Sequence, residues 1–201
     1  MIRFAYIILA AMMVCGCVAH NAGNGEKIDI VTTVSGNPMI DPPMPGQNRV
    51  LVKIVNPTDQ NDLNPQEALK NGLAAKGYRL VDYPDQANYT IMGRIVQAGE
   101  TEPQLLKEAY RSRYGTRLSL QESGDDMLAN AVGQLVGEVR AKSYLMIVDL
   151  KITSQQQIKN KARRRTIKTR IVSGIQGTRA PAEEIMPQIR DKVVHSAVSM
   201  F

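Results

Sequence analysis

The chain has 201 residues, 43% of them hydrophobic, and a formal net charge of +6. This length supports one well-buried domain, and the absence of tryptophan leaves Ile, Val, Leu, Met and Tyr to fill its core. The positive charge predicts an anionic partner.

The N-terminus has the pattern of a lipoprotein export signal. Arg3 precedes an uncharged run of about 11 residues ending at Val14, whereas a transmembrane helix needs about 20. The following Val14, Cys15, Gly16 and Cys17 match the end of bacterial lipoprotein signals, with a small residue before the modified cysteine. We expect cleavage between Gly16 and Cys17, a diacylglyceryl thioether on Cys17 and an acylated new N-terminus. The alternative is an ordinary secretory signal with a chance cysteine.

Three parts of the chain follow from this interpretation. We expect a signal peptide at residues 1–16, a lipidated flexible tether at 17–27, and a single α+β domain at 28–201 with a variable middle at about 99–142. Loss of Cys15 with the signal leaves no thiol for a disulfide. Two or more acyl chains provide stable anchoring. Val18 rather than Asp follows Cys17, so we expect the outer membrane, with outer-membrane lipids as anionic partners, no nucleic acid and no cofactor besides the covalent lipid.

The first half of the domain combines strands with one helix. Strands are predicted at 28–34, 49–56, 78–83 and 88–98, and the proline-rich residues 35–46 form an irregular connector. Asn64 is a plausible N-cap, with Pro65 at the first position of a helix that runs to about Lys76 and buries Leu69 and Leu73. Gly77 is placed to end this helix in a left-handed conformation.

The second half has a less regular middle and a stronger end. Helices are predicted at 102–113, 125–140 and 181–200, strands at 143–153 and 165–175, and loops at 119–124 and 154–165. In the strand at 143–153, Tyr144, Met146 and Val148 share a face with Leu150 and Ile152. The last helix repeats apolar residues at every fourth position, namely Ile185, Ile189, Val193 and Ala197. We predict an antiparallel or mixed sheet with packed helices.

Several segments together resemble one known family. They read VLVKIVNPTDQ, LKNGLAAKGYRLVDYPDQANYTIMGRIVQA, YLMIVDLKIT, and TIKTRIVSG followed by EEIMPQIRDKVV. These segments, their order and the lipoprotein signal resemble the TraT family of outer-membrane lipoproteins. The resemblance implies an oligomeric, surface-associated lipoprotein of conjugative plasmids that prevents mating-pair stabilisation, called surface exclusion, and confers resistance to complement. These are blocking functions, so no enzyme activity is expected.

The middle of the chain departs from that family. The resemblance implies long Gly/Ala-rich apolar segments that enter the membrane, but this chain has only about 13 such residues at 127–139, too few to span a bilayer as a helix. This departure and the basic charge favour an alternative, a periplasm-facing structural lipoprotein of an envelope, secretion or conjugation machine. Surface exposure remains the preferred interpretation, with a homo-oligomer and conjugation or envelope proteins as expected partners.

Two groups of residues are candidate contact sites. Gly133 and Gly137 have the spacing that allows close helix approach, which predicts either a subunit or membrane contact or plain packing on the sheet. A basic run is a candidate phosphate contact or a solvated hairpin tip, and it consists of Lys161, Arg163, Arg164 and Arg165, with Lys168 and Arg170 after it.

The remaining polar residues do not form a recognisable active site. Asp149, in an apolar strand, is expected to pair with Lys151 or a cross-strand cation rather than to act in catalysis. His20 and His195 lie in the tether and on a helix, so no metal site with workable spacing is predicted. The adjacent acids at 125–126 and 183–184 are explained by helix N-termini. No nucleophile elbow, P-loop or dinucleotide fingerprint is present.

Overall fold

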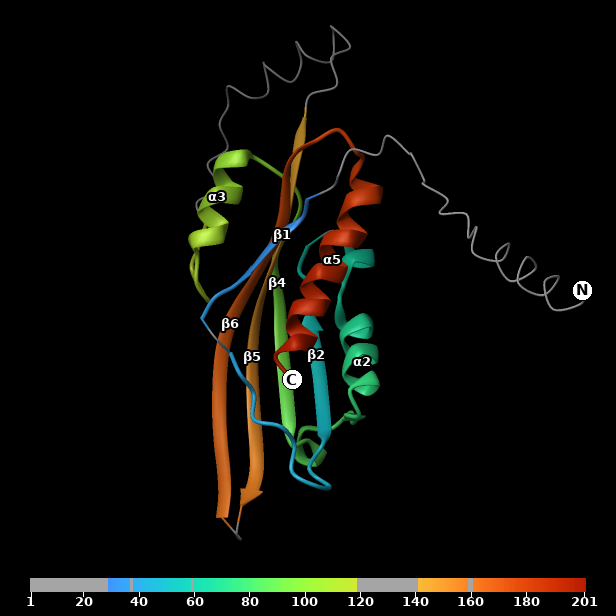
Figure 1. Cartoon of the computed structure of the whole chain (residues 1–201), viewed down its shortest axis with the longest axis vertical. Coiled ribbons are helices and arrows are strands. Elements are labelled where there is room, and N and C mark those ends of the chain that lie inside the picture. The colour runs from blue at the N-terminus through green and yellow to red at the C-terminus, as the bar shows by residue number, and fades with distance from the viewer. Residues whose placement is uncertain (1–28, 37, 59, 119–140, 159–160) are drawn as a thin grey trace, which may run out of the picture.

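A computed structural model describes residues 29–36, 38–58, 60–118, 141–158 and 161–201. Within them, one six-stranded sheet carries three α-helices (Figure 1). The strands are β1 (Val31–Val34), β2 (Arg49–Val55), β3 (Arg79–Leu80), β4 (Tyr89–Thr101), β5 (Lys142–Ile158) and β6 (Lys161–Thr178). The helices are α2 (Gln66–Ala75), α3 (Pro103–Arg111) and α5 (Ala182–Ser199), with short 3-10 turns at Asn61–Leu63 and Pro84–Gln86.

The sheet is mixed, with strand order β1-β6-β5-β4-β2-β3. β2 runs parallel to both β3 and β4, whereas β4, β5, β6 and β1 pair in antiparallel fashion. The parallel β2–β4 pair requires a crossover, which α2 and β3 supply. The expected α+β class is therefore confirmed.

The main core lies between the sheet and the pair α2 and α5. Leu69 and Leu73 of α2 are buried as the periodicity predicts, and so are all four apolar residues at every fourth position of α5. Alternate β5 residues from Tyr144 to Ile152 face these helices and belong to the same core cluster. Gly77 ends the α2 turn with a φ of 87°, which confirms the predicted left-handed conformation.

The start of α2 matches the predicted cap with a small shift. The helix begins at Gln66, one residue later than predicted, and the Asn64 side chain accepts a hydrogen bond from the Gln66 backbone N–H at 3.0 Å. This contact satisfies one of the N–H groups that a helix start leaves without an intrahelical partner.

On the opposite face of the sheet, α3 is the only helix among the described residues, and it covers part of the area (Figure 1). Leu106 and Ala109 of α3 pack on Leu145, Ile147 and Val172 to form a second, smaller core cluster. Gly174 permits this approach, because a Cβ there would lie 2.6 Å from the Tyr144 carbonyl oxygen and 2.7 Å from Leu106 Cδ1. β5 therefore buries side chains on both faces at its start.

The predicted loop at 154–165 is wrong. β5 continues to Ile158 and β6 begins at Lys161, so most of these polar residues belong to a long hairpin. They carry no apolar alternation because this end of the hairpin extends beyond β4, which begins at Tyr89 opposite Ser154. Backbone pairing between β5 and β6 sustains the strands where side-chain burial does not. The predicted strand at 78–83 is likewise reduced to Arg79–Leu80.

Several predictions lie outside the described residues. They are the signal peptide and the whole tether, the loop at 119–124 and the helix at 125–140 with its acidic start and its two glycines. Among the described helices, none is long and apolar enough to cross a membrane.

Candidate functional site: polar clasps and basic surfaces

Asp149 and Arg170 form the most buried ion pair of the described domain. Arg170 Nε donates to Asp149 Oδ1 at 2.6 Å, and Nη2 donates to Oδ2 at 2.8 Å, which is a bidentate geometry. The Arg170 and Asp149 side chains are 1% and 12% exposed. They occupy opposite positions on adjacent strands, so Asp149 pairs with a cross-strand cation, one of its two expected partners.

This pair fastens the segment after α3 to the sheet. Arg170 Nη1 donates to Ser112 Oγ at 3.0 Å and to the Thr116 carbonyl at 2.9 Å. The Gly115 backbone N–H donates to Asp149 Oδ2 at 3.1 Å. Both carboxylate oxygens and all three guanidinium nitrogens are thus engaged, so the pair serves as a structural clasp.

The end of β1 is held at the same place. The Ser35 backbone N–H donates to the Arg170 carbonyl, and its Oγ accepts from the Arg170 backbone N–H, both at 2.8 Å. Thr169 Oγ1 donates to the Ser35 carbonyl at 2.8 Å. The connector that follows β1 therefore starts at a residue that is hydrogen-bonded to β6.

A second polar cluster fastens that connector to the main core. Tyr89 Oη donates to the Asp41 carbonyl at 3.1 Å and accepts from Gln156 Nε2, which also donates to the Pro42 carbonyl at 3.2 Å. Tyr89 packs edge-on against Tyr78 and Phe201. The Tyr78 hydroxyl is buried without a hydrogen-bond partner in the structure, and burial, followed by the nearby Tyr89, raises its pKa to about 12.

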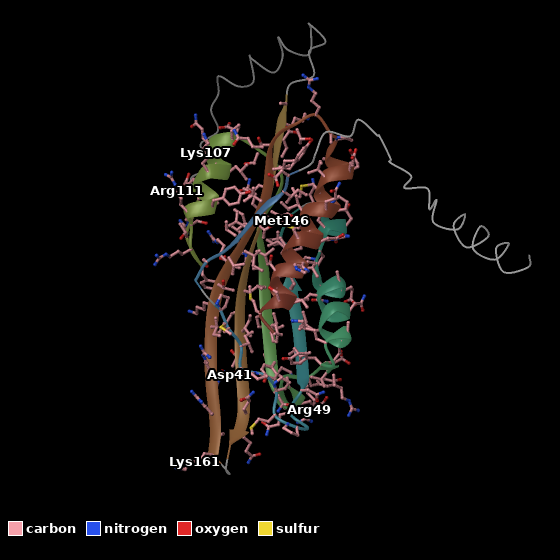
Figure 2. All side chains as sticks on the ribbon, in the orientation of Figure 1. Asp41, Arg49, Lys107, Arg111, Met146 and Lys161 are labelled. Atoms are coloured by element: carbon pink, nitrogen blue, oxygen red, sulfur yellow. The ribbon has the colours of Figure 1, made fainter. Side chains whose placement is uncertain are left out.

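The predicted basic run does not converge on one point. By strand alternation, Arg163 and Arg165 lie on the face of α2 and α5, because they oppose Gln156 and Ser154, whereas Arg164 lies on the other face. All are exposed, and Lys161 stands at the far end of the hairpin (Figure 2). Arg165 also forms an exposed ion pair with Asp41 at 3.5 Å.

A polar hollow of about 430 Å³ lies beside this end of the hairpin, lined by residues that include Arg49, Asp85 and Asn88. Several of its polar groups bond to one another. Gln47 exchanges two hydrogen bonds with the Gln157 backbone, at 2.8 and 3.1 Å, and Asn88 Oδ1 accepts from the Arg49 backbone N–H at 3.3 Å. This hollow is explained by the packing of the connector on the hairpin.

A second basic surface lies on the sheet face that α3 leaves uncovered. Lys53, Met92, Lys151 and Lys168 occupy directly opposed positions on β2, β4, β5 and β6. Each of the four is exposed. We call these four residues the lysine row. Lys168 also lies over the Tyr114 ring, with 5.6 Å between its Nζ and the ring centroid.

The other predicted residues fall in separate places. Gly16, Cys17, Gly133 and Gly137 lie outside the described residues. His195 is exposed on α5, and residues 183–184 stand in the first turn of α5, as their predicted role at a helix N-terminus requires. In the part of the chain that the structure describes, no three His, Cys, Asp or Glu residues are grouped as a metal site requires.

Sequence reasoning missed the clasp partner of Asp149 and the lysine row. Arg170 belongs by sequence to the basic run, although its neighbours Thr169 and Ile171 are both fully buried. The sequence gives one indication of the lysine row: by the alternation of β5, Lys151 lies on the face opposite to Leu150 and Ile152. Strand register is needed to bring Lys53 and Lys168 beside it.

Comparison with known proteins decides the family. The sequence model for the "Enterobacterial TraT complement resistance protein" matches residues 27–164, which is more than half of the chain and runs from before β1 into β6. The chain belongs to the TraT family. TraT proteins are non-enzymatic outer-membrane lipoproteins of enterobacteria with a general role in surface exclusion and complement resistance. No curated protein matches the chain in sequence.

Among solved structures, the chain is similar to a dodecamer of a PelC point variant from Paraburkholderia phytofirmans. The identity is 15% and the TM-score 0.40, over 83% of this chain and 95% of that chain. This likeness is too distant for the assembly of that protein to bear on this one.

Proposed function

We propose that this TraT protein is a non-catalytic lipoprotein, anchored through a diacylglyceryl group and palmitate at Cys17, that blocks mating-pair stabilisation and complement attack at the cell surface. The observation that carries the proposal is the family match over residues 27–164. The matched region includes the Asp149 side of the clasp and most of the exposed surfaces described above. The proposed action is occlusion by a folded domain, as a homo-oligomer, and requires no reacting group.

The polar clusters support a non-catalytic role. A general base needs an oxygen free to accept a substrate proton, but both Asp149 oxygens accept hydrogen bonds from Arg170 and Gly115. The second cluster, at Tyr89, likewise joins the connector to the core. Both clusters hold segments of the chain together, which suits a domain that acts through its surface.

We propose two contact sites with different roles. We assign the basic end of the hairpin, with Lys161, Arg163, Arg164 and Arg165, to contact with anions of the envelope, supported by its exposure and its position at the tip. Gly133 and Gly137 are proposed as a subunit or membrane contact on their spacing alone.

The anchor is tested by substitution at the two cysteines. Cys17→Ser is expected to abolish incorporation of labelled palmitate and to release the protein from the membrane fraction. Cys15→Ala is the matched control and should leave both properties unchanged. Loss of anchoring in Cys15→Ala alone would show that the modified cysteine is assigned wrongly.

The function is tested in recipient cells that carry the gene, an empty vector or the Cys17→Ser variant. Mating with a matched donor should yield fewer transconjugants only with the anchored protein, and survival in serum should rise in the same strain. Protease added to intact cells should remove the folded domain. An unchanged transfer frequency would refute surface exclusion, and full protection from protease would indicate the periplasm-facing structural role.

A further inference from the structure

We infer that the sheet face left uncovered by α3 binds the phosphate groups of an anionic lipid surface, with the lysine row as its centre. This inference goes beyond the proposed blocking function, because it concerns how the domain lies on its membrane. It rests on strand register, exposure and charge, and not on the basic end of the hairpin.

Strand register builds the face in three adjacent rows. The lysine row lies between a row of Leu51, Thr90, Thr153 and Thr166 and a row of Val55, Arg94, Asp149 and Arg170. Because neighbouring strands lie about 4.8 Å apart, the lysine row spans roughly 14 Å from Lys53 to Lys168. Arg170 and Asp149 are covered by the segment after α3, so the cations that these rows expose are Lys53, Arg94, Lys151 and Lys168.

The cations of this face have little to neutralise them. Asp149 is the one carboxylate in these rows, and Arg170 already occupies both of its oxygens. No ion pair within the described residues involves Lys53, Lys151 or Lys168. Lys151 and Lys168 are directly opposed on neighbouring strands, an arrangement that is destabilising by itself. An external anion would remove this repulsion.

The combination of cations with exposed apolar side chains on this face favours a lipid surface. Lysine presents a compact ammonium charge that binds phosphate as a point charge, without the fixed geometry of an arginine fork. The hydroxyls of Thr90, Thr153 and Thr166 lie in the neighbouring row, where those of Thr153 and Thr166 bond to each other at 3.2 Å. Met92 and Val55 are 41% and 51% exposed among these cations, and such side chains suit the boundary between head groups and acyl chains.

The proposed anchor leaves enough chain for this contact. Val31, the first residue of β1, lies 14 residues after Cys17. A fully extended chain of that length spans at most about 50 Å. The domain can therefore lay its uncovered face on the head groups of the leaflet that holds the anchor.

The test measures lysine reactivity in the full chain. The protein is purified from membranes in detergent and reconstituted, with its own N-terminus, into vesicles of phosphatidylcholine alone or of an equal mixture with phosphatidylglycerol. Acetylation rates are measured at each lysine by mass spectrometry. We expect the rates at Lys53, Lys151 and Lys168 to fall several-fold with phosphatidylglycerol and to recover in high salt. The rates at Lys76 and Lys192, which are exposed at the end of α2 and on α5 on the other face of the sheet, should stay unchanged.

Two variants with the same change in net charge sharpen the test. In Lys53→Glu/Lys151→Glu, the rate at Lys168 should no longer depend on phosphatidylglycerol, whereas in Lys76→Glu/Lys192→Glu it should depend on it as in the wild type. Thermal unfolding followed by circular dichroism shows whether each variant is folded.

A second measurement does not rely on charge reversal. A fluorophore attached to the thiol that Met92→Cys introduces should be quenched by spin-labelled phosphatidylglycerol.

Several results would overturn the inference. They are a fall in the acetylation rate that is equal at all lysines, no fall in the rate at the lysines of the row, and rates at these lysines that are already low on neutral vesicles. Equal protection by inorganic phosphate in the presence of neutral vesicles would indicate a site for free anions instead. Equal protection by polyglutamate would indicate an acidic polypeptide as the partner.

Discussion

The face of the sheet under α2 and α5 and the face that carries α3 share the same strands, but their side chains differ in chemistry. Toward α5, alternate residues of β5 stay apolar from Tyr144 to Ile152. On the other face, β5 is apolar at Leu145 and Ile147 and then changes to Asp149 and Lys151. The change comes where the cover of α3 ends. Burial on the second face therefore depends on where α3 and the segment after it lie, because that segment covers Asp149 and Arg170. Exposed positions further along the strands, such as Lys151, are available for contact with other molecules.

The clasp at this boundary should give the largest effect. Arg170→Ala leaves the Asp149 carboxylate without its cation, so we expect the free energy of unfolding to fall by about 3–5 kcal/mol. Chemical denaturation of the purified protein measures it. Arg165→Ala is the control, because its exposed pair with Asp41 should contribute less than about 1 kcal/mol. Equal, small effects would show that the clasp is not what holds the segment after α3.

The second largest effect is expected where α3 packs closely on the sheet. Gly174→Ala places a methyl group against the Tyr144 carbonyl oxygen, which cannot move without disturbing the β5–β6 pairing, and we expect a loss of about 1–3 kcal/mol. The control, Gly72→Ala, meets a methyl group of Val198 at 2.6 Å but removes a glycine from inside α2. Its net effect should be within about 1 kcal/mol. Thermal unfolding of both variants decides whether α3 packs as closely as described.

Two tyrosines of the main core form a third, smaller test. Tyr89→Phe removes the donor to the Asp41 carbonyl and an acceptor of Gln156, so stability should fall by about 1–2 kcal/mol. Tyr78→Phe removes a buried hydroxyl that has no partner in the structure, and it should leave stability equal or slightly higher. Denaturation midpoints of the two single variants give the comparison. A larger loss in Tyr78→Phe would mean that its hydroxyl has a partner after all.

The lysine row should give the smallest effect, and in the opposite direction. Lys151→Glu replaces a like-charge pair with Lys168 by an opposite-charge pair, so we expect a gain of about 0.2–1 kcal/mol at low salt. The gain should shrink as salt screens the charges. Lys192→Glu on α5 is the control. A loss of stability in Lys151→Glu would show that the lysines of the row do not repel one another in the folded protein.

Local sequence determined the main core and most elements of this protein. The alternation of β2, β4 and β5 and the four-residue repeat of α5 each report which side of an element is buried, because periodicity of 2 or 3.6 residues directly follows from backbone geometry. Gly77 was predictable for a similar reason, since its left-handed conformation is demanded by the helix that ends before it. The resemblance to TraT also came from such segments.

Only the tertiary structure decided the second face and the hairpin. Whether Arg170 is buried depends on Asp149 and on Ser112 and Thr116, which lie between 21 and 58 residues away along the chain. The polar strands beyond residue 154 are maintained by pairing between β5 and β6, which leaves no apolar pattern in the sequence. The lysine row exists only because register aligns single residues of four strands. Long-range pairing sets these neighbours, and no local pattern contains it.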